Sequence, residues 1–366
     1  MHDGRIEKGG VVLKEYLLSR NSEQIKLHNT YCGEQPEFLL ELLNAPEVLR
    51  LDGISVSCGG CYTKFLKHKY FLSKLDHSYG MALIMWNHTR DKTQTLSALF
   101  HDISIPVFSH AGDFFLGDSL KQEASETMTS EIIRNSSQVM SFLEKNNISL
   151  SDVDDYKKYP LADNDKPRLA ADRLETQLHF PLSIGSISLD VAKEIYKDIT
   201  ILRNEDDNPE LGFKSLKYAE QFANIALDSD KKYYRSFEAI TNNQMIVMIL
   251  ENVIKEGLIN KEDIFIKTEK QIIDIIKTSG SRRLKSIWMY FEELHDKHKI
   301  TVTAAEPFGN KLYVSKVNVK KRYIDPLVKA ETGIYRISEL SKAINESLKN
   351  YNNEVDNFYA SVDIDF

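Results

Sequence analysis

The sequence has no long apolar run. The longest runs, MALIMW at 81–86 and MIVMIL at 245–250, are far shorter than the roughly 18 residues that a membrane span needs. The N-terminus also does not show the charged, apolar and small-residue pattern of a secretory signal. We therefore expect a cytoplasmic protein with no membrane segment.

Cysteine is scarce, with 3 residues among 366, an odd number. This count argues against a framework of disulfides and predicts a reduced chain. Cys58 and Cys61 have the spacing of metal ligands, and Cys32 is a third thiol. A CxxC without a second pair is a weak signal for structural zinc, so the two glycines between these cysteines favour another role.

Positive charge is not in excess either. The net charge is −7 and the isoelectric point is near 5.9, which argues against general attraction to nucleic acid or anionic lipid. No Walker-type GxxxxGK[ST] motif is present, and its absence argues against a P-loop fold. The basic runs SRRLK (281–285) and KVNVKKRY (316–323) either meet phosphates or form a solvated face. Any phosphate binding must therefore be local.

The sequence is rich in helical periodicity. With 42% hydrophobic and 28% charged residues it has a globular composition, and apolar residues recur at spacings of three and four. These patterns predict a mostly α protein. The segments with this spacing are 36–51, 79–86, 95–100, 130–146, 188–202, 222–227, 242–258 and 271–279.

Strand-like alternation occurs only late, at 298–324, where FGN supplies a turn between two runs. A small β element near the C-terminus is therefore predicted. The polar stretches 152–167 and 203–212 are typical of loops, and residues 352–366 of an acidic tail.

The dipeptide His-Asp occurs three times, at 2–3, 101–102 and 295–296. The first lies at a terminus that we expect to fray, and the last lies in a charged string typical of a solvated helix end. Only the pair at 101–102 follows an apolar run, so it is the candidate for chemistry.

Two helical patterns separated by the polar stretch NHTRDK predict an antiparallel helix pair. His77 opens the first helix, and His101 with Asp102 closes the second, so these three side chains converge. Asp172, beside an apolar stripe, is a fourth candidate. Two imidazoles and two carboxylates suit one divalent ion, with Mn, Fe, Mg, Ni and Zn not distinguished. The alternatives are a capping Asp76, a core His77 and an exposed Asp172.

The order of these residues resembles the HD superfamily of metal-dependent phosphohydrolases. The longer segments resemble its deoxynucleoside triphosphate triphosphohydrolase branch over roughly residues 45–180. They are RLDGISVSCGGCYTKF (50–65), LDHSYG (75–80), ALFHDISIPVFSHAGD (98–113) and LAADRLE (169–175). The resemblance implies an HD-domain helical core over residues 1–185. A helical C-terminal region over 186–366 would then carry the small β element, at about 298–325, and the acidic tail.

The resemblance also assigns roles to the candidate residues. It implies that His77, His101, Asp102 and Asp172 are the metal ligands. His110 and Asp113, three apart and so on one face of a short helix, match the histidine and acid that lie near the scissile phosphate. Such a histidine can protonate the leaving oxygen or orient the nucleophile, and the acid would hold its tautomer. The alternative is a capping Ser109 followed by a surface histidine and acid.

Substrate contacts are implied in the same way. Gly59 and Gly60 lack side chains, so a ligand can approach the backbone closely, and the branch places such glycines beside the nucleotide sugar. Tyr62 would then face the pocket. Lys74 and Arg173 are placed to neutralise the phosphate chain.

The chain departs from the branch at three places. Lys74 stands where the branch has an arginine, Ser104 where it usually has glycine, and the segment LKQEASE (120–126) offers no His-Glu pair. The expected function is metal-dependent hydrolysis of a nucleotide phosphate, with (deoxy)nucleoside triphosphates favoured. The alternatives are a nucleotidase or phosphodiesterase, or a non-catalytic nucleotide-binding regulator. We expect a homo-oligomer, and neither membrane nor nucleic acid as partner.

Overall fold

The structure is a computed structural model of the chain. It describes residues 19–118, 126–294, 300–304, 311–314, 320–354 and 359–363.

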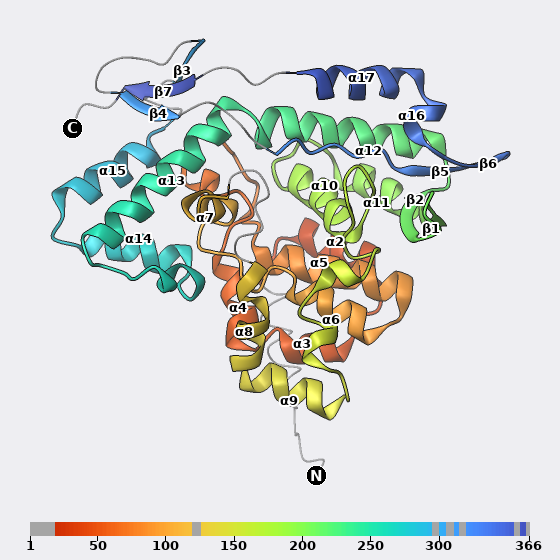
Figure 1. Ribbon diagram of the computed structural model, residues 1–366, viewed down its shortest axis with the longest axis horizontal. Coiled ribbons are helices and arrows are strands. Elements are labelled where there is room, and N and C mark those ends of the chain that lie inside the picture. Colours follow the sequence, from red (N-terminus) through yellow and green to blue (C-terminus); the bar gives the residue numbers. More distant parts are fainter. Residues whose placement is uncertain are drawn as a thin grey trace.

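Helices dominate the architecture, as the periodicity predicts (Figure 1). The α-helices are α2 Ser22–Tyr31, α3 Glu37–Leu42, α4 Pro46–Leu49, α5 Lys74–Thr89, α6 Lys92–Phe100, α7 His110–Phe115, α8 Thr129–Asn135, α9 Ser137–Lys145, α10 Ala171–Ser183, α11 Leu189–Lys197, α12 Leu216–Ser229, α13 Phe237–Lys255, α14 Glu269–Thr278, α15 Arg282–Glu292, α16 Ile337–Leu340 and α17 Lys342–Asn353. Short 3₁₀ turns are η1 Arg50–Gly53, η2 Gly60–Tyr62, η3 Glu126–Met128, η4 Leu150–Asp152, η5 Tyr156–Lys158 and η7 Glu262–Phe265, and η6 Asp230–Tyr234 is a π-helical turn.

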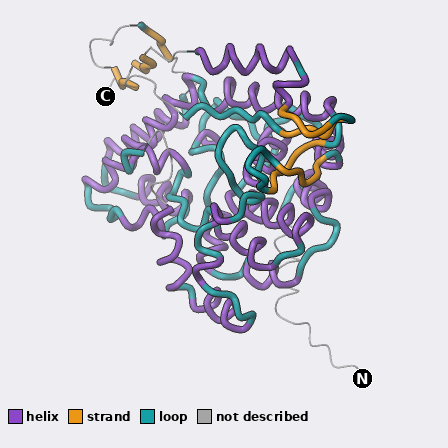
Figure 2. The backbone as a smooth tube through the Cα atoms, turned by 45° about the vertical axis from the view of Figure 1, so that its right-hand side comes forward, coloured by secondary structure: helices purple, strands orange, loops and turns teal. Residues whose placement is uncertain are grey.

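Two small sheets complete the described part of the chain, and Figure 2 shows them at separate edges of the molecule. The first has the order β1-β2-β5-β6, with β2 and β5 parallel and the other pairs antiparallel. The second has the order β3-β7-β4 and is antiparallel. The strands are β1 Ile199–Arg203, β2 Pro209–Phe213, β3 Ile300–Thr303, β4 Lys311–Val314, β5 Leu327–Ala330, β6 Gly333–Arg336 and β7 Tyr359–Asp363.

Two predictions were wrong because strand pairing over long sequence distances overrode local patterns. The helix predicted at 188–202 ends at Lys197, and the following residues form β1. The loop predicted at 203–212 contains most of β2, which pairs with both β1 and β5. Local periodicity carries no information about such partners.

The predicted acidic tail also contains a strand. β7 lies between β3 and β4, and its Ala360 and Val362 are buried. Burial of these alternate apolar side chains outweighs the acidic composition of the segment. The predicted FGN turn lies outside the described residues.

Smaller corrections concern helix continuity. The helix predicted at 36–51 is split into α3, α4 and η1, and Pro46 begins the second piece, where its missing amide is tolerated. The helix predicted at 130–146 is split at Ser136, whose backbone is extended. The periodicity therefore located helical segments correctly but did not show their interruptions.

One hydrophobic core runs through the described chain. It includes residues of α5, α6 and α10 together with residues of α13, α15 and α17. Figure 1 shows α7 beside α13, so the segment after the His-Asp pair packs on the C-terminal region. The boundary at residue 185 stays a prediction.

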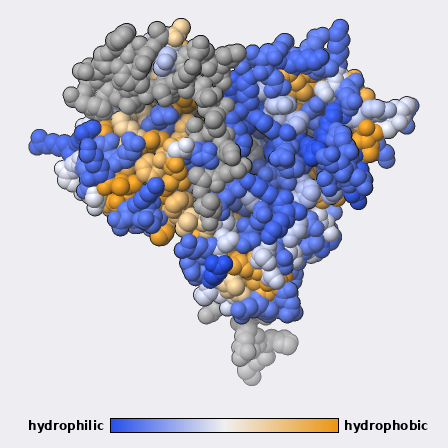
Figure 3. Space-filling view, in the orientation of Figure 1, coloured by the Kyte–Doolittle hydropathy of each residue, from blue (hydrophilic) through white to orange (hydrophobic). Residues whose placement is uncertain are grey.

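The surface adds one observation about membranes and one about apolar side chains. Among the described residues, no helix is both long and apolar enough to span a bilayer. On the face shown in Figure 3, apolar side chains gather over α13 and α14. Ile266 and Met289, 68% and 55% exposed, are the most exposed large apolar residues described.

Candidate metal centre

His77 lies in the first turn of α5 because a capping box fixes where that helix begins. The Ser73 hydroxyl accepts a hydrogen bond from the Asp76 amide, and the Asp76 carboxylate accepts one from the Ser73 amide. These two bonds satisfy amides that a helix start leaves unpaired. Asp76 is thus a capping residue, and His77 follows it directly.

The second helix of the pair brings His101 to the same place. The Asp91 carboxylate caps the start of α6, and His101 is the residue at its C-terminal end. The Nε2 atoms of His77 and His101 lie 3.1 Å apart, so the start of α5 meets the end of α6. The predicted antiparallel pair is confirmed.

The two carboxylates complete the cluster. Asp102 Oδ2 is 3.1 Å from Nε2 of His101 and 3.8 Å from Nε2 of His77. Asp172, in the first turn of α10, places Oδ1 3.1 Å from Nε2 of His77. The structure therefore brings all four predicted ligands together, although they span almost 100 residues of sequence.

Contacts behind the cluster fix which nitrogen of each histidine faces it. Nδ1 of His101 lies 2.8 Å from the carbonyl oxygen of Ala98, and Nδ1 of His77 lies 2.5 Å from Glu175 Oε2. Each Nδ1 is therefore directed at an acceptor oxygen, and both Nε2 atoms face the cluster. Burial opposes the charge on His77, yet Glu175 and Asp172 raise its pKa to about 10, so its Nε2 would release a proton on binding a cation.

Glu175 is a residue that sequence reasoning missed. It follows Asp172 by three positions on α10, so both side chains lie on one face of the helix. That spacing was a signal available in the sequence.

The donor set fits a divalent cation. Two imidazole nitrogens and two carboxylate oxygens face one another, and all four can donate a lone pair to a positive ion. Burial raises the pKa of Asp102, but His101 and Lys74 outweigh it and hold that pKa well below the ordinary range. Burial also opposes ionisation of Asp172, but its bond to His77 lowers that pKa below the ordinary value. Both carboxylates are thus charged, as metal ligands must be.

Lys74 is the basic residue nearest the cluster. Its Nζ lies 2.8 Å from Asp102 Oδ2, and both side chains are buried. Burial opposes the charged ammonium, yet Asp102 raises the pKa of Lys74 above its ordinary value. A buried positive charge therefore lies beside the predicted ligands.

His110 and Asp113 form the predicted pair. Nδ1 of His110 is 3.0 Å from Asp113 Oδ2, and Asp113 is fully buried. The pKa of His110 is lowered, chiefly by burial, with Lys74 and Arg322 adding to the effect and Asp113 opposing it. The ring is therefore neutral near pH 7. Its Nδ1 proton is directed at Asp113, and Nε2 is left for proton transfer.

The approach to His110 is strained. Phe108 and Ser109 have φ of +63° and +53°, in a region that non-glycine residues rarely adopt. The Ser109 hydroxyl donates to the Ser55 carbonyl oxygen at 2.5 Å, which ties this turn to the glycine-rich loop. Ser109 occupies the N-cap position of α7, as the alternative interpretation proposed, but its side chain makes no capping bond. Tertiary contacts hold the conformation that presents His110.

The segment 57–62, which contains Gly59 and Gly60, was expected to turn Tyr62 toward the pocket, but Tyr62 is not among the residues that line it. Gly59 has φ of +81°, which strains a residue that has a side chain, and a Cβ there would also lie within 3.0 Å of Ile246 Cδ1. The Tyr62 hydroxyl donates to Glu269 Oε2 at 2.8 Å. Ser57 and Cys58 line the pocket beside the cluster. Roles for Gly59, Gly60 and Tyr62 in substrate binding stay predictions.

Arg173 lines the pocket while its guanidinium is engaged by a loop. It forms an ion pair of 2.9 Å with Asp163 and donates to Asn164 and to the Arg168 carbonyl oxygen. The loop predicted at 152–167 therefore positions this cation. Binding of phosphate by Arg173 stays a prediction.

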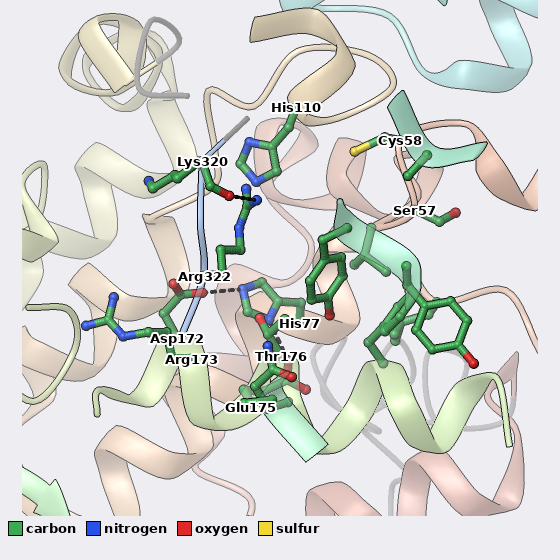
Figure 4. A pocket seen from close by; sticks show the side chains of 18 of the residues that line it. Ser57, Cys58, His77, His110, Asp172, Arg173, Glu175, Thr176, Lys320 and Arg322 are labelled. Atoms are coloured by element: carbon green, nitrogen blue, oxygen red, sulfur yellow. Dashed lines mark hydrogen bonds and ion pairs between the residues drawn. The ribbon is translucent and has the colours of Figure 1, made fainter. Parts of the chain in front are cut away.

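One pocket extends from the cluster toward the C-terminal region. At one end it is lined by His77, His110 and Asp172, as Figure 4 shows. The other end is mainly apolar and aromatic, with Leu66, Leu72, Phe65, Phe180, Tyr233 and Tyr234. Such a pocket can bind a ligand that has both a charged group and an aromatic ring.

Basic side chains from the C-terminal region reach this pocket. Lys320 and Arg322 line this pocket and also a second cavity that is lined by His101 and Asp102, and Figure 4 shows Arg322 beside His110, His77 and Asp172. Both lie in the basic run 316–323. No sequence pattern places this run near His77, His110 and Asp172, which precede it by roughly 150 to 250 positions.

Several other sequence features lie elsewhere. In the described part of the chain, the two groups able to hold a metal contain no cysteine. Burial raises the pKa of both Cys58 and Cys61, which disfavours the thiolate form that metals bind. The His-Asp pairs at 2–3 and 295–296, and residues 120–125 of the segment without a His-Glu pair, are outside the described residues.

Comparison with solved structures shows the fold. The crystal structure of a phosphohydrolase from Bacteroides thetaiotaomicron VPI-5482 matches with a TM-score of 0.64 and 15% identity, over 90% of this chain and 96% of that one. A hypothetical protein from Aquifex aeolicus matches with a TM-score of 0.59 and 13% identity, over 90% and 92%. The predicted helical phosphohydrolase fold is confirmed.

Sequence comparison adds two relatives, while no family model matches the chain. Metal-dependent phosphohydrolase cns2 of Cordyceps militaris is 28% identical over 193 residues, 52% of this chain and 54% of cns2. About half of the chain is thus similar to a metal-dependent phosphohydrolase. The uncharacterized protein YdhJ of Bacillus subtilis (strain 168) is 23% identical over 250 residues, 68% of this chain and 74% of YdhJ. The similarity to cns2 supports the predicted hydrolase activity.

Proposed function

We propose that this phosphohydrolase relative cleaves (deoxy)nucleoside triphosphates into nucleoside and inorganic triphosphate. The observation that carries the proposal is a pocket lined by His77 and Asp172 of the ligand cluster, by His110, which is bonded to Asp113, and by apolar and aromatic side chains. A nucleotide has the matching parts, because its phosphates are charged and its base is a flat aromatic ring whose faces stack on aromatic side chains.

The ligand cluster would act on the phosphate nearest the sugar. His77, His101, Asp102 and Asp172 would hold a divalent ion, which supplies charge neutralisation and lowers the pKa of water when it is bound. Water attacks the α-phosphorus, and the bond from phosphorus to the 5′ oxygen breaks. The departing 5′ oxygen takes up a proton, and triphosphate leaves with the new oxygen.

His110 would move a proton in this reaction. With Nδ1 bonded to Asp113, its Nε2 accepts a proton from the attacking water, and the imidazolium so formed is stabilised by the Asp113 carboxylate. The same nitrogen can then return the proton to the 5′ oxygen. The lowered pKa of His110 supports this order, since the ring is neutral before the reaction.

The phosphate chain would lie among cations. Lys74, Arg173 and Arg322 line the pocket near the cluster, and each can offset negative charge on the β- and γ-phosphates. Lys74 is already paired with Asp102, so a substrate phosphate and this carboxylate would share its ammonium. Truncation of Arg173 should raise KM for triphosphates more than for monophosphates.

Product analysis tests the proposal. The protein is loaded with each divalent ion in turn and incubated with the (deoxy)nucleoside triphosphates in ¹⁸O-labelled water. The products are then separated and identified by mass spectrometry. We expect unlabelled nucleoside and triphosphate that carries one ¹⁸O. The Asp102→Ala variant, treated identically, should release nothing.

Other products would contradict the proposal. Monophosphate with pyrophosphate, or diphosphate with orthophosphate, would place the cleavage at another phosphorus. Label in the nucleoside would mean attack at carbon. Activity on monophosphates or diesters alone would favour the nucleotidase or phosphodiesterase interpretation.

A further inference from the structure

The basic side chains at the pocket belong to an extended segment, residues 320–326, which we call the strap. Its Lys320 and Arg322 line both the pocket at His77, His110 and Asp172 and the second cavity at His101 and Asp102. Arg322 Nη1 also donates to the Lys320 carbonyl oxygen at 3.5 Å, as Figure 4 shows. Two cations of the strap thus lie where the proposed substrate would carry its phosphates.

Lys321, between these two residues, is bonded to the end of α17. Its Nζ donates to the carbonyl oxygens of Tyr351, Asn352 and Glu354 at 3.1, 2.8 and 2.6 Å. The last carbonyls of a helix lack partners within the helix and carry partial negative charge. Lys321 therefore caps α17 and fixes the backbone between Lys320 and Arg322.

A second contact holds the strap from the same helix. The buried Tyr351 hydroxyl donates to Asp230 Oδ2 at 2.5 Å and accepts the Arg322 amide at 3.0 Å. Asp230 is also buried and begins η6, which carries Tyr233 and Tyr234 of the apolar end. One hydroxyl thus joins the strap, α17 and the wall of the pocket.

We infer that Lys321 and Tyr351 are positioning residues that hold Lys320 and Arg322 at the phosphates of the substrate. The C-terminal helix α17, which does not line the pocket, would in this way set the affinity for the phosphate chain. The inference rests on the proposed function for the identity of the substrate, but its binding step does not require hydrolysis.

The test compares Lys321→Met and Tyr351→Phe with wild type in the metal-loaded full chain. Binding of inorganic triphosphate is measured by calorimetry, and KM and kcat are measured with the hydrolysed nucleotide. Loss of one such hydrogen-bonding group should weaken triphosphate binding and raise KM by roughly five- to tenfold, with kcat changed by less than about twofold. A merely structural role would not separate KM from kcat in this way.

Matched variants control for general damage. Lys342→Met makes the same change at the exposed start of α17, and Tyr335→Phe makes the tyrosine change in β6; both should behave as wild type. Lys321→Arg keeps a cation able to reach the same carbonyls and should restore binding. If Tyr351→Phe melts at a markedly lower temperature, the Lys321 series decides the question.

The outcomes separate this inference from the proposed function. Wild-type affinity for triphosphate in both variants, or a fall in kcat at unchanged KM, would overturn the inference. Wild type that does not bind triphosphate would overturn it as well. Triphosphate binding that weakens in the variants, in a protein that hydrolyses no nucleoside triphosphate, would support the positioning role and contradict the proposed function.

Discussion

The described part of the molecule contains two buried clusters of potential metal ligands, and one carboxylate connects them. His77, His101 and Asp102 form one, and His28, Glu175 and His179 form the other. In each, the potential ligand atoms lie within 4.8 Å of one another. Glu175 connects them, since it bonds Nδ1 of His77 at 2.5 Å and Nδ1 of His179 at 2.6 Å. Proximity of histidines and carboxylates does not distinguish the two.

The two clusters differ in the number of charged carboxylates and in whether they open on the pocket. The first cluster gains Asp172, has two charged carboxylates, and opens on the pocket. In the second, Nε2 of His28 lies 3.1 Å from the Asp76 carbonyl oxygen, and burial and His179 lower the pKa of His28 to about 4. Burial opposes the charge on its single carboxylate, Glu175, yet the two bonded histidines lower that pKa to about 2. We interpret the second cluster as support for the first.

The largest difference between the clusters should appear when a ligand of the first is removed. Asp102→Ala or His101→Ala should release the single divalent ion that we expect per chain, because each removes a coordinating group. Metal analysis of the purified variants measures this. Asp228→Ala, on an exposed part of α12, is the control and should keep its ion. Full occupancy in either ligand variant would mean that the site is misplaced.

His110→Ala should separate chemistry from metal binding. We expect turnover to fall by roughly 10²- to 10⁴-fold, the usual range for a general acid or base, with metal content and fold unchanged. An unaltered rate would assign proton transfer to another group.

The pH dependence of the wild type sharpens this second prediction. Since the pKa of His110 is lowered from 6.5 and the neutral ring accepts the proton, kcat/KM should rise with pH through that lowered pKa. It should be level above about pH 6.5. A profile that falls over the same interval would mean that the charged ring is the reactive form.

Glu175→Gln tests the link between the clusters. The amide keeps the shape but not the charge that orients His77, so metal affinity should fall by about 10- to 100-fold. Titration with a competing chelator measures the change. Glu194→Gln, on the surface of α11, should leave the affinity unaltered, and equal affinities in both variants would remove Glu175 from the metal site.

A buried carboxylate with no histidine partner offers a contrast with Glu175. Burial raises the pKa of Glu269 from 4.5 to about 8, while Tyr62 and the Ser55 amide oppose the shift. The folded state then binds a proton that the unfolded state releases. The contribution of Glu269 to the free energy of unfolding is therefore fully present below about pH 4.5 and is lost as pH rises through 8.

Glu269→Gln should remove that loss, because glutamine resembles the neutral acid. Urea unfolding at about pH 5 and about pH 9 should show wild type weakening by a few kcal/mol more than the variant. The exposed Glu131→Gln on α8 should follow wild type. Parallel pH dependence in wild type and Glu269→Gln would mean that Glu269 is ionised in the fold.

The smallest effect on function is expected at His28. His28→Gln should leave metal content unchanged and turnover within about twofold, and should cost about 1–2 kcal/mol of stability through its lost hydrogen bond. Metal analysis and urea unfolding report the two quantities. Loss of a second ion in this variant would show that both clusters bind metal.

The order of the metal ligands, and the helices that carry His77 and His101, could be predicted from local sequence patterns alone. His77 and His101 meet because a short polar stretch joins two helices, and such a connection makes them antiparallel neighbours. The caps at Ser73 and Asp91 are local as well. Asp172 was a candidate because it lies beside an apolar stripe, but only the family resemblance joined it to ligands 70 or more residues earlier in the sequence.

The surroundings of the ligands, in contrast, depend on long-range contacts. Arg322 reaches the pocket because Lys321 and Tyr351 fix the strap on α17, and no local pattern near residue 322 reports that contact. Likewise, β7 forms inside an acidic segment because β3 and β4 accept it on both edges. Helix periodicity and caps depend on neighbours within a few residues. Strand pairing and pocket lining depend on partners far along the chain, which become neighbours only when the chain has folded.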